Sequence, residues 1–328
     1  MNDFSQRILD WYAENGRDLP WRRTSNPYAV WLSEIILQQT RIAQGTAYWH
    51  RFMETFPTVK DLADASEDQV LRLWEGLGYY SRARNLHKAA KQIVALGAFP
   101  DTLEGIRALQ GVGDYTAAAI GSICFGLPAA VVDGNVYRVL ARYFGLETPV
   151  GTTQAKKEFT ALAQKLLPQE APAQFNQGMM DFGAIQCTPQ NPDCLTCPLQ
   201  GSCNAFQTGR THLLPVKKPA VKPQERQLNY IYVRYKGETA IRRRGPGDVW
   251  QGLYEPLVLT APSGQLLQKK VKHQLTHRTI LANFYLWEPS HRPTLPEGYF
   301  WIKETELDAY AKPRLFEKLI EIAGRSRQ

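Results

Sequence analysis

Apolar and polar positions divide the chain into a helical first part and a second part that contains strands. Near the N-terminus, one apolar helix face is formed by Ile8, Leu9, Trp11 and Tyr12. A helical pattern continues to about residue 165, with glycines and prolines marking the turns between segments. No strong strand pattern precedes residue 200, so this first part is predicted to be all-α.

The longest uncharged run in the helical part covers residues 115–132. Its 18 residues reach the length of a short membrane span, but Gly121, Gly126 and Pro128 interrupt it. We therefore predict a buried helix that ends in a turn. The N-terminus has no basic start followed by an apolar core, so no signal peptide is predicted and the protein is expected to be soluble and intracellular.

The pattern changes after residue 208. Residues 209–227 hold three prolines and several basic residues with little periodicity, which is typical of a semi-rigid linker. Strands are predicted at residues 228–241, with a hairpin turn at Lys236-Gly237, and at 253–259 and 279–287; a helix is predicted at 307–323. Residues 1–208 and 228–328 are thus predicted to form a helical domain and a small α+β domain.

Composition and charge narrow the function classes. The 328 residues are 44% hydrophobic and 21% charged, which excludes a largely disordered, collagen-like or coiled-coil protein. Residues 1–208 carry 18 basic and 20 acidic side chains, whereas residues 209–328 carry 21 and 11, so the net charge of +8 comes from the second part. A basic half indicates a polyanionic partner.

Four of the five cysteines lie close together in the sequence. Cys187, Cys194, Cys197 and Cys203 form the pattern C-x6-C-x2-C-x5-C. In a chain without a secretory signal, this density favours a metal site over disulfides, and both zinc and iron–sulfur are chemically possible. The fifth, Cys124, lies in the apolar run 115–132 and is predicted to be a core residue.

Two further patterns predict acid–base chemistry near a phosphate-binding turn. Gly111 and Gly113 precede a predicted helix, where backbone amides attract anions such as a DNA phosphate. Asp133 follows an apolar run, a position typical of a helix N-cap. Glu34 shares a predicted helix side with Gln38, and its apolar neighbours would raise the pKa of its carboxyl, as a general acid requires.

These segments resemble, in order along the chain, the endonuclease III and MutY superfamily of DNA glycosylases. Residues 109–117 (LQGVGDYTA) are similar to its helix-hairpin-helix motif, although Gln110 stands where the family usually has proline. Residues 132–136 (VDGNV) match the segment that holds its catalytic aspartate. The cysteine spacing matches its 4Fe–4S loop at 187–203, which shapes a DNA contact and does not catalyse hydrolysis.

Within that superfamily, residues 32–40 (LSEIILQQT) closely resemble the LSE-x-x-LQQT motif of MutY adenine glycosylases. Endonuclease III-like enzymes carry a lysine nucleophile at the position of Tyr115, so the resemblance implies a monofunctional enzyme that forms no Schiff base. It also implies that Glu34 is the general acid and that Asp133 stabilises the sugar cation, while Tyr115 and Asn135 position the reacting groups.

Other matched segments imply contacts with substrate and DNA. Residues 17–22 (RDLPWR) and 176–181 (NQGMMD) imply an adenine site, and residues 76–86 (GLGYYSRARNL) match another family signature. The residues implied in the adenine site are Arg17, Arg22 and Gln177; those implied in the base stack around the lesion pair are Gln39 and Tyr79; those implied at the DNA backbone are Gly111 and Gly113.

Residues 228–328 resemble the MutT-like domain of MutY proteins, without the Nudix hydrolase box, so recognition and not hydrolysis is implied. The family's F-S-H loop, which contacts 8-oxoguanine, is matched by Leu275-Thr276-His277, so Thr276 and His277 are implied in lesion recognition. Candidate phosphate contacts are Arg242, Arg243, Arg244, Lys269, Lys270 and Lys272.

The resemblance implies a monofunctional adenine DNA glycosylase with one 4Fe–4S cluster. Its partner would be double-stranded DNA with adenine opposite 8-oxoguanine or guanine, and its product an abasic site for base excision repair. Two alternatives are a non-catalytic iron–sulfur DNA-binding protein and an endonuclease III-like glycosylase/lyase. The protein is expected to be a cytoplasmic, nucleoid-associated bacterial monomer without membrane contact.

Overall fold

The computed structural model describes residues 2–219 and 223–325. Residues 220–222 of the predicted linker, and residues 1 and 326–328 of the predicted domains, lie outside the described residues. The chain forms two compact units, Met1–Ala63 with Lys88–Pro219 and Asp64–His87 with Ala220–Gln328. Residues 64–87, which the sequence analysis assigned to the helical domain, therefore group with the C-terminal part of the chain.

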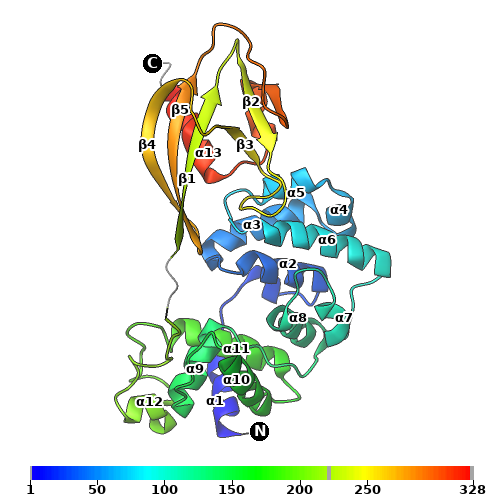
Figure 1. Ribbon diagram of the computed structural model, residues 1–328. Helices are drawn as coiled ribbons and strands as arrows, with labels where there is room; N and C mark the ends of the chain where they lie inside the picture. The colour runs from blue at the N-terminus through cyan, green and yellow to red at the C-terminus, as the bar shows by residue number, and fades with distance from the viewer. Residues whose placement is uncertain (1, 220–222, 326–328) are drawn as a thin grey trace. The chain divides into compact units, whose positions relative to one another are not determined.

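The first unit is helical, and every named element within residues 2–219 is a helix, as predicted (Figure 1). Two helices cross the division between the units along the chain: α4 (Val59–Asp64) and α6 (Ser81–Leu96). The others in the first unit are α1 (Asp3–Asn15), η1 (Pro20–Arg22), α2 (Pro27–Leu37), α3 (Ile42–Thr55), α7 (Leu103–Arg107), α8 (Asp114–Phe125), α9 (Gly134–Phe144), α10 (Thr153–Leu166), α11 (Pro172–Ile185), η2 (Gln200–Ser202) and α12 (Asn204–Gln207).

The predicted buried helix within residues 115–132 is α8. It ends at Gly126, which adopts a left-handed conformation with φ of 64°, where a residue without a Cβ is favoured. The backbone amide of Gly126 bonds back to the Gly121 carbonyl and closes the turn. Within the described residues, none of the helices has both the length and the apolar character needed to cross a bilayer.

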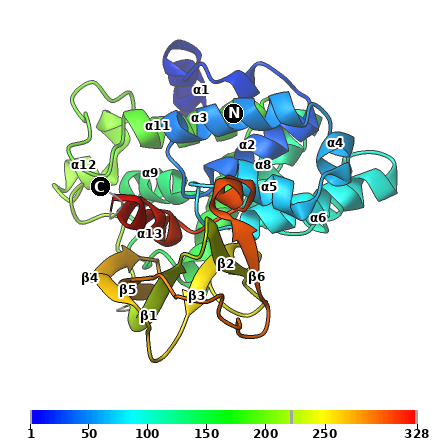
Figure 2. The same cartoon turned by 90° about the horizontal axis from the view of Figure 1, so that it is seen from above.

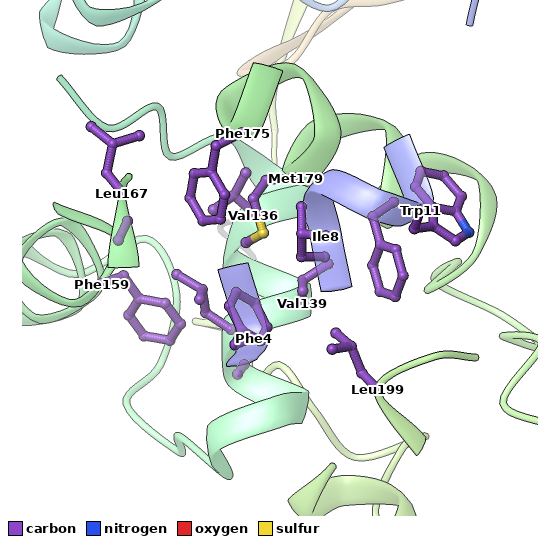
Figure 3. Packing of buried hydrophobic residues seen from close by; sticks show 14 of the residues in the cluster. Phe4, Ile8, Trp11, Val136, Val139, Phe159, Leu167, Phe175, Met179 and Leu199 are labelled. Atoms are coloured by element: carbon purple, nitrogen blue, oxygen red, sulfur yellow. The ribbon is translucent and has the colours of Figure 1, made fainter. Parts of the chain in front are cut away.

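Helix α1 packs against helices that lie more than a hundred residues later in the sequence. Figure 3 shows side chains of α1 pointing into the same cluster as side chains of α9 and α11. The labelled residues of this cluster are Phe4, Ile8, Trp11, Val136, Val139, Phe159, Leu167, Phe175, Met179 and Leu199. Burial of each large side chain contributes about 1.5–3 kcal/mol, so this cluster fixes α9 and α11, which both carry site residues.

The second unit contains α5 (Glu67–Leu73) and a mixed six-stranded sheet of order β4-β5-β1-β3-β2-β6. The strands are β1 (Gln224–Val233), β2 (Glu238–Arg243), β3 (Tyr254–Val258), β4 (Gln265–Gln274), β5 (Arg278–Trp287) and β6 (Tyr299–Lys303). Strands β1 and β5 run parallel, and the other neighbours are antiparallel. Helix α13 (Arg314–Arg325) contacts β1, β4 and β5 (Figure 2).

The predicted hairpin over residues 228–241 is only partly right. Lys236 and Gly237 form the turn, with φ of 48° and 80°, and Tyr235 and Glu238 bridge it. Beyond that bridge β3 lies between β1 and β2. The reason is apolar packing: Leu257 of β3 forms one buried cluster with residues of both flanking strands.

Three other expectations for the second unit need correction. Strand β1 begins at Gln224, inside the predicted linker. The predicted helix 307–323 begins only at Arg314, because Pro313 interrupts it and Leu307 belongs to the 3-10 helix η3 (Glu304–Ala309). Strands β4 and β6 were missed; β4 is an edge strand with several exposed lysines, so it lacks the apolar alternation of a half-buried strand.

Candidate active site

Glu34 lies in the middle of α2, a helix that is apolar on nearly every side. Asn26 caps the helix by accepting a hydrogen bond from the Tyr28 amide at 2.9 Å, and Pro27 occupies its first turn. The residues on both sides of Glu34, Ser33 and Ile35, are buried. Glu34 itself is half-buried because its side chain faces a cavity of about 640 Å³.

Asp133 faces the same cavity from the start of α9. One of its carboxyl oxygens accepts hydrogen bonds from the backbone amides of Asn135 and Val136, both at 2.8 Å. The other oxygen accepts a bond from the Asn135 side-chain amide, also at 2.8 Å. Asp133 is therefore an N-cap and a cavity-lining carboxyl at once, so the N-cap expected from the sequence is compatible with the catalytic role that the resemblance implies.

Asn135 is held in turn by a buried arginine. Its side-chain oxygen accepts a hydrogen bond from Arg138 Nη2 at 2.8 Å, and the same nitrogen donates to the Gly183 carbonyl at 2.6 Å. Arg138 Nε donates to the Cys187 carbonyl at 2.7 Å. A Cβ on Gly183 would lie 2.6 Å from the Asn135 Cβ, so only glycine permits this close approach of α11 to α9. These contacts fix the Asp133 carboxyl from two helices.

The environments of the two carboxyls differ in their hydrogen-bond donors. Burial raises the pKa of Glu34 to about 7, and the negative charge of Asp133 acts in the same direction. A hydrogen bond donated by Tyr115 and the positive charge of Arg22 oppose this rise. Burial also raises the pKa of Asp133, but three N–H donors and the charge of Arg138 work against that rise.

Tyr115 supplies a neutral hydroxyl to the cavity. Burial, followed by the charges of Glu34 and Asp133, raises the pKa of this phenol well above its usual value. The hydroxyl therefore keeps its single proton, for which Glu34 and the Met180 sulfur, 3.5 Å away, are the two alternative acceptors.

Arg17 and Arg22 also line the cavity, and both bind one carboxylate that the sequence analysis missed. Asp181 of α11 is fully buried and accepts hydrogen bonds from both guanidinium groups. The signal in the sequence was a single acidic residue within the apolar segment Met179–Gly183, which is improbable unless the acid is paired.

Two glutamines complete the predicted set at this cavity. Gln39 lies just after α2 with φ of 57°, a left-handed conformation that exposes its side chain at the cavity rim. Gln177 of α11 accepts a hydrogen bond from the Tyr12 hydroxyl at 2.6 Å. That bond uses the amide oxygen, so the amide nitrogen is the group left to face a ligand.

Tyr79, Thr276 and His277 do not line this cavity. They belong to the second unit, where they line another cavity of about 830 Å³. Tyr79, with φ of 47°, and Thr276 share a hydrogen bond between their hydroxyls. Thr276 and His277 are exposed at the turn between β4 and β5, while Leu275 packs against the core of the sheet.

The candidate phosphate contacts in the second unit separate into two groups. Arg242 and Arg244 both pair with the buried carboxylate of Glu255, and Arg243 pairs with Glu67 at 2.8 Å. These arginines therefore serve internal ion pairs. The lysines predicted beside them, Lys269, Lys270 and Lys272, are exposed on β4.

The glycine hairpin lies between α7 and α8. Gly111 has φ of 79°, which favours glycine, and Gly113 is the N-cap of α8. Gln110, which replaces the usual proline, donates its backbone amide to the Gln92 side chain at 2.7 Å. Proline has no amide hydrogen, so this bond holds the turn in a way that proline could not.

The four cysteines of the loop line a single cavity together with Arg142 and Leu199. Burial raises the pKa of Cys197 to about 11, and the neighbouring thiols add to the rise, so the sulfurs lie near one another. In residues 2–219 and 223–325, no three His, Cys, Asp or Glu side chains are arranged to hold a single metal ion. Arg142 Nη1 lies 3.4 Å from the Cys187 sulfur, where a cation would stabilise bound thiolates. Four thiols around one cavity with an adjacent cation fit an iron–sulfur cluster.

Three families match successive parts of the chain. The HhH-GPD superfamily of base excision DNA repair proteins matches residues 32–169, and the iron-sulfur binding domain of endonuclease III matches residues 187–203. The NUDIX domain matches residues 229–322. The match to the iron-sulfur binding domain decides between zinc and iron–sulfur: the loop binds a single 4Fe–4S cluster.

Similar proteins and structures agree with these matches. An adenine DNA glycosylase of Buchnera aphidicola subsp. Acyrthosiphon pisum (strain APS) is 36% identical over 254 residues, which cover 76% of this chain and 73% of the relative. The human adenine DNA glycosylase is 44% identical over 62% of this chain and 39% of its own length. A thermostable thymine-DNA glycosylase structure is 30% identical with a TM-score of 0.57, covering 62% of this chain and 95% of its own. A trapped endonuclease III–DNA covalent intermediate, 24% identical over 62% of this chain and 94% of its own with a TM-score of 0.55, shares the fold.

Replacing Cys197 by serine should remove the cluster. We expect purified Cys197→Ser protein to hold far less iron than one cluster per chain and to lose visible absorbance, because serine is a poor ligand for iron–sulfur clusters. Cys124→Ser is the matched control, since Cys124 lies on α8 outside the loop. Full iron content in Cys197→Ser, or an equal loss in the control, would contradict the assignment.

Proposed function

The chain belongs to the adenine DNA glycosylase family of base excision repair, and from that premise we propose that it hydrolyses adenine from A:8-oxoguanine and A:G mispairs with Glu34 and Asp133. The observation that carries this proposal is that the two carboxyls face one cavity from different helices. A non-catalytic DNA-binding protein would have no need for that convergence.

The substrate nucleotide must leave the duplex before these groups can reach it. Extrusion of a nucleotide costs about a few kcal/mol of lost stacking and pairing. The cavity of about 640 Å³ lies in the volume range of small-molecule sites, so a purine nucleoside is a suitable occupant. Arg17, Arg22 and Gln177 line its wall and offer N–H donors to the acceptor nitrogens of adenine.

Glu34 would supply the proton that adenine needs in order to leave. Because the pKa of Glu34 is about 7, a large fraction of the carboxyl is protonated at neutral pH. Proton transfer to N7 of adenine lets the C1′–N9 bond break with its electron pair moving onto the base, so the leaving group is neutral. The hydrogen bond from Tyr115 keeps the Glu34 side chain oriented toward the cavity.

Asp133 would stabilise the sugar while the bond breaks. The sugar develops oxocarbenium character, and an ionised carboxylate nearby lowers the energy of that cation. The three N–H donors on Asp133 favour its ionised form, and Asn135 holds one oxygen in place. Water then adds to C1′ and gives up a proton to the Glu34 carboxylate, which restores the acid and leaves an abasic site.

We propose that the enzyme is monofunctional. Tyr115 occupies the position of the lysine in the lyase motif, and a phenol cannot form a Schiff base with the sugar. The cluster holds the loop 187–203 together and takes no part in hydrolysis. An endonuclease III-like lyase would instead be trapped on DNA by borohydride.

The cavity of the second unit supports a role in recognising the base opposite adenine. Tyr79 offers an aromatic face, and Thr276 and His277 offer polar groups beside it. We propose that these residues contact 8-oxoguanine and that Gln39 and Tyr79 enter the base stack. Gly111 and Gly113 would bind a phosphate, and the enzyme would act as a monomer on DNA in the bacterial cytoplasm. Residues 1–208 would carry the catalytic groups, and residues 228–328, together with Tyr79, would contact the opposite base.

The substrate preference is tested with three duplexes that differ in one base. Purified protein is incubated with A:8-oxoguanine, A:G and A:T duplexes, and alkali then cleaves any abasic strand. We expect cleavage of the two mispairs and little of A:T, because a paired, undamaged adenine is the most costly to extrude. Equal cleavage of all three would contradict recognition of the opposite base.

Removal of the acid should stop the chemistry and spare binding. Glu34→Gln keeps the shape of the side chain and loses the proton, so we expect single-turnover excision to fall about 10²–10⁴-fold. Binding to the A:8-oxoguanine duplex, measured by gel shift, should remain near that of the unsubstituted protein. The control is Glu14→Gln, an exposed glutamate on α1. Near-normal turnover of Glu34→Gln would refute the acid assignment.

The excision rate should depend on pH through the same proton. The pKa of Glu34 is raised to about 7, so the acid is present below that pH and is lost as pH rises through it. We expect the single-turnover rate to fall about tenfold per pH unit above that point. A rate that stays flat from pH 6 to about 9 would show that the proton comes from another group.

A further inference from the structure

Asp181 is a fully buried carboxylate on α11 with more hydrogen-bond donors than any other acid described above. One oxygen accepts from Arg17 Nε at 2.8 Å and from Arg22 Nη2 at 2.9 Å. The other accepts from the Arg17 backbone amide at 2.9 Å and from Arg22 Nη1 at 2.6 Å. Arg17 Nη2 donates as well. One carboxylate therefore fixes both guanidinium groups and the start of the segment that joins them.

These arginines are part of the cavity wall that Glu34 shares. The side chain of Arg22 is 11% exposed and that of Arg17 is 29% exposed, so solvent screens their charges only partly. Their charges therefore act strongly on neighbouring groups. Arg22 already lowers the pKa of Glu34, against the larger effect of burial. Asp181 lies behind them and does not line the cavity, so its charge reaches the cavity only together with theirs.

We propose that Asp181 is a positioning residue for adenine excision: it holds Arg17 and Arg22 in the cavity wall and limits the positive charge that acts on Glu34. The proposal rests on Glu34 being the acid. Without Asp181, Arg22 would keep its charge, lose its partner and favour the ionised form of Glu34. The arginines would then still bind the base, but a smaller fraction of Glu34 would carry the proton needed for its release at neutral pH.

The charged and titratable groups around Glu34 come from every element that packs there. They are Arg17 and Arg22 near η1, Arg41 at the start of α3, Tyr115 and Cys124 of α8, Asp133 before α9, and Asp181 of α11 behind the arginines, with Tyr12 of α1 beside Arg22. Tyr115, Tyr12 and Cys124 all have a raised pKa and stay neutral near pH 7. The charges that act on Glu34 are thus the positive charges of Arg17, Arg22 and Arg41 and the negative charges of Asp133 and Asp181.

Asp181 and Arg22 carry opposite charges, so removing each of them should shift the pH dependence of excision in opposite directions. Single-turnover excision on the A:8-oxoguanine duplex is measured from pH 5 to 9 for Asp181→Asn and Arg22→Gln in the full-length protein. Asp181→Asn removes a negative charge and should move the midpoint of the alkaline limb down by about one pH unit. Arg22→Gln removes a positive charge and should move it up by about the same amount.

The control for a nearby carboxylate is Asp18→Asn. Asp18 follows Arg17 in the sequence, but its side chain is 70% exposed and pairs with Arg23. The midpoint of the alkaline limb in Asp18→Asn should therefore stay within about 0.2 pH units of that of the unsubstituted protein. Thermal melts and gel shifts on the same duplex report folding and binding. A purely structural role for Asp181 would lower the rate at every pH and leave the midpoint in place.

Two results would overturn the proposal: an unchanged midpoint in Asp181→Asn, or shifts of the same sign in both variants. If Asp181→Asn does not fold, Arg22→Gln decides alone, and a midpoint that fails to rise refutes the proposal. Failure of the underlying function looks different, because the unsubstituted protein would then release no adenine, or its alkaline limb would persist in Glu34→Gln.

Discussion

The central constraint on this molecule is that two carboxyl groups share one cavity while only one of them is surrounded by N–H donors. Asp133 has three such donors, whereas Glu34 has a single hydroxyl donor and an otherwise apolar helix around it. Burial acts on both, and the difference in donors separates their affinities for a proton. The negative charge of Asp133 then helps Glu34 to keep its proton, so each group supports the protonation state of the other.

Helix α11 provides most of the framework for this arrangement. Its Asn176 side chain accepts a hydrogen bond from the Val131 amide at 3.0 Å and so fixes the segment that leads to Asp133. Gly183 lets the helix approach Asn135 closely, and Asp181 holds the two arginines. The apolar cluster that joins α11 to α1 and α9 fixes this helix in turn (Figure 3). Because α11 helps to fix the surroundings of both Glu34 and Asp133, a small shift of this helix would disturb both carboxyls together.

The sequence was sufficient for the helical and mixed architecture and for the family, because apolar periodicity, glycine turns and the cysteine spacing are local signals. Several of the residues that it singled out, Glu34 and Asp133 among them, do line the cavity, since LSEIILQQT and VDGNV are contiguous strings. It did not reveal Asp181, whose partners lie some 160 residues away and are set by packing. Strand order failed for the same reason: β3 separates β1 and β2 through apolar contacts that the Lys236-Gly237 turn cannot encode. The polar edge strand β4 carried no alternating pattern to detect.

A titration of the two carboxyls tests the account most directly. Carbon-13 labels on the side-chain carboxyls of Glu and Asp, assigned with Glu34→Gln and Asp133→Asn, allow each signal to be followed by NMR as pH changes. The asparagine at position 133 still caps α9, so that variant removes a charge without removing the cap. The account predicts that Glu34 loses its proton near pH 7 and that Asp133, whose pKa burial raises against three N–H donors, loses its proton at a lower pH than Glu34. If Glu34 were ionised at the pH of an ordinary exposed carboxyl, the proposed division of roles would be wrong.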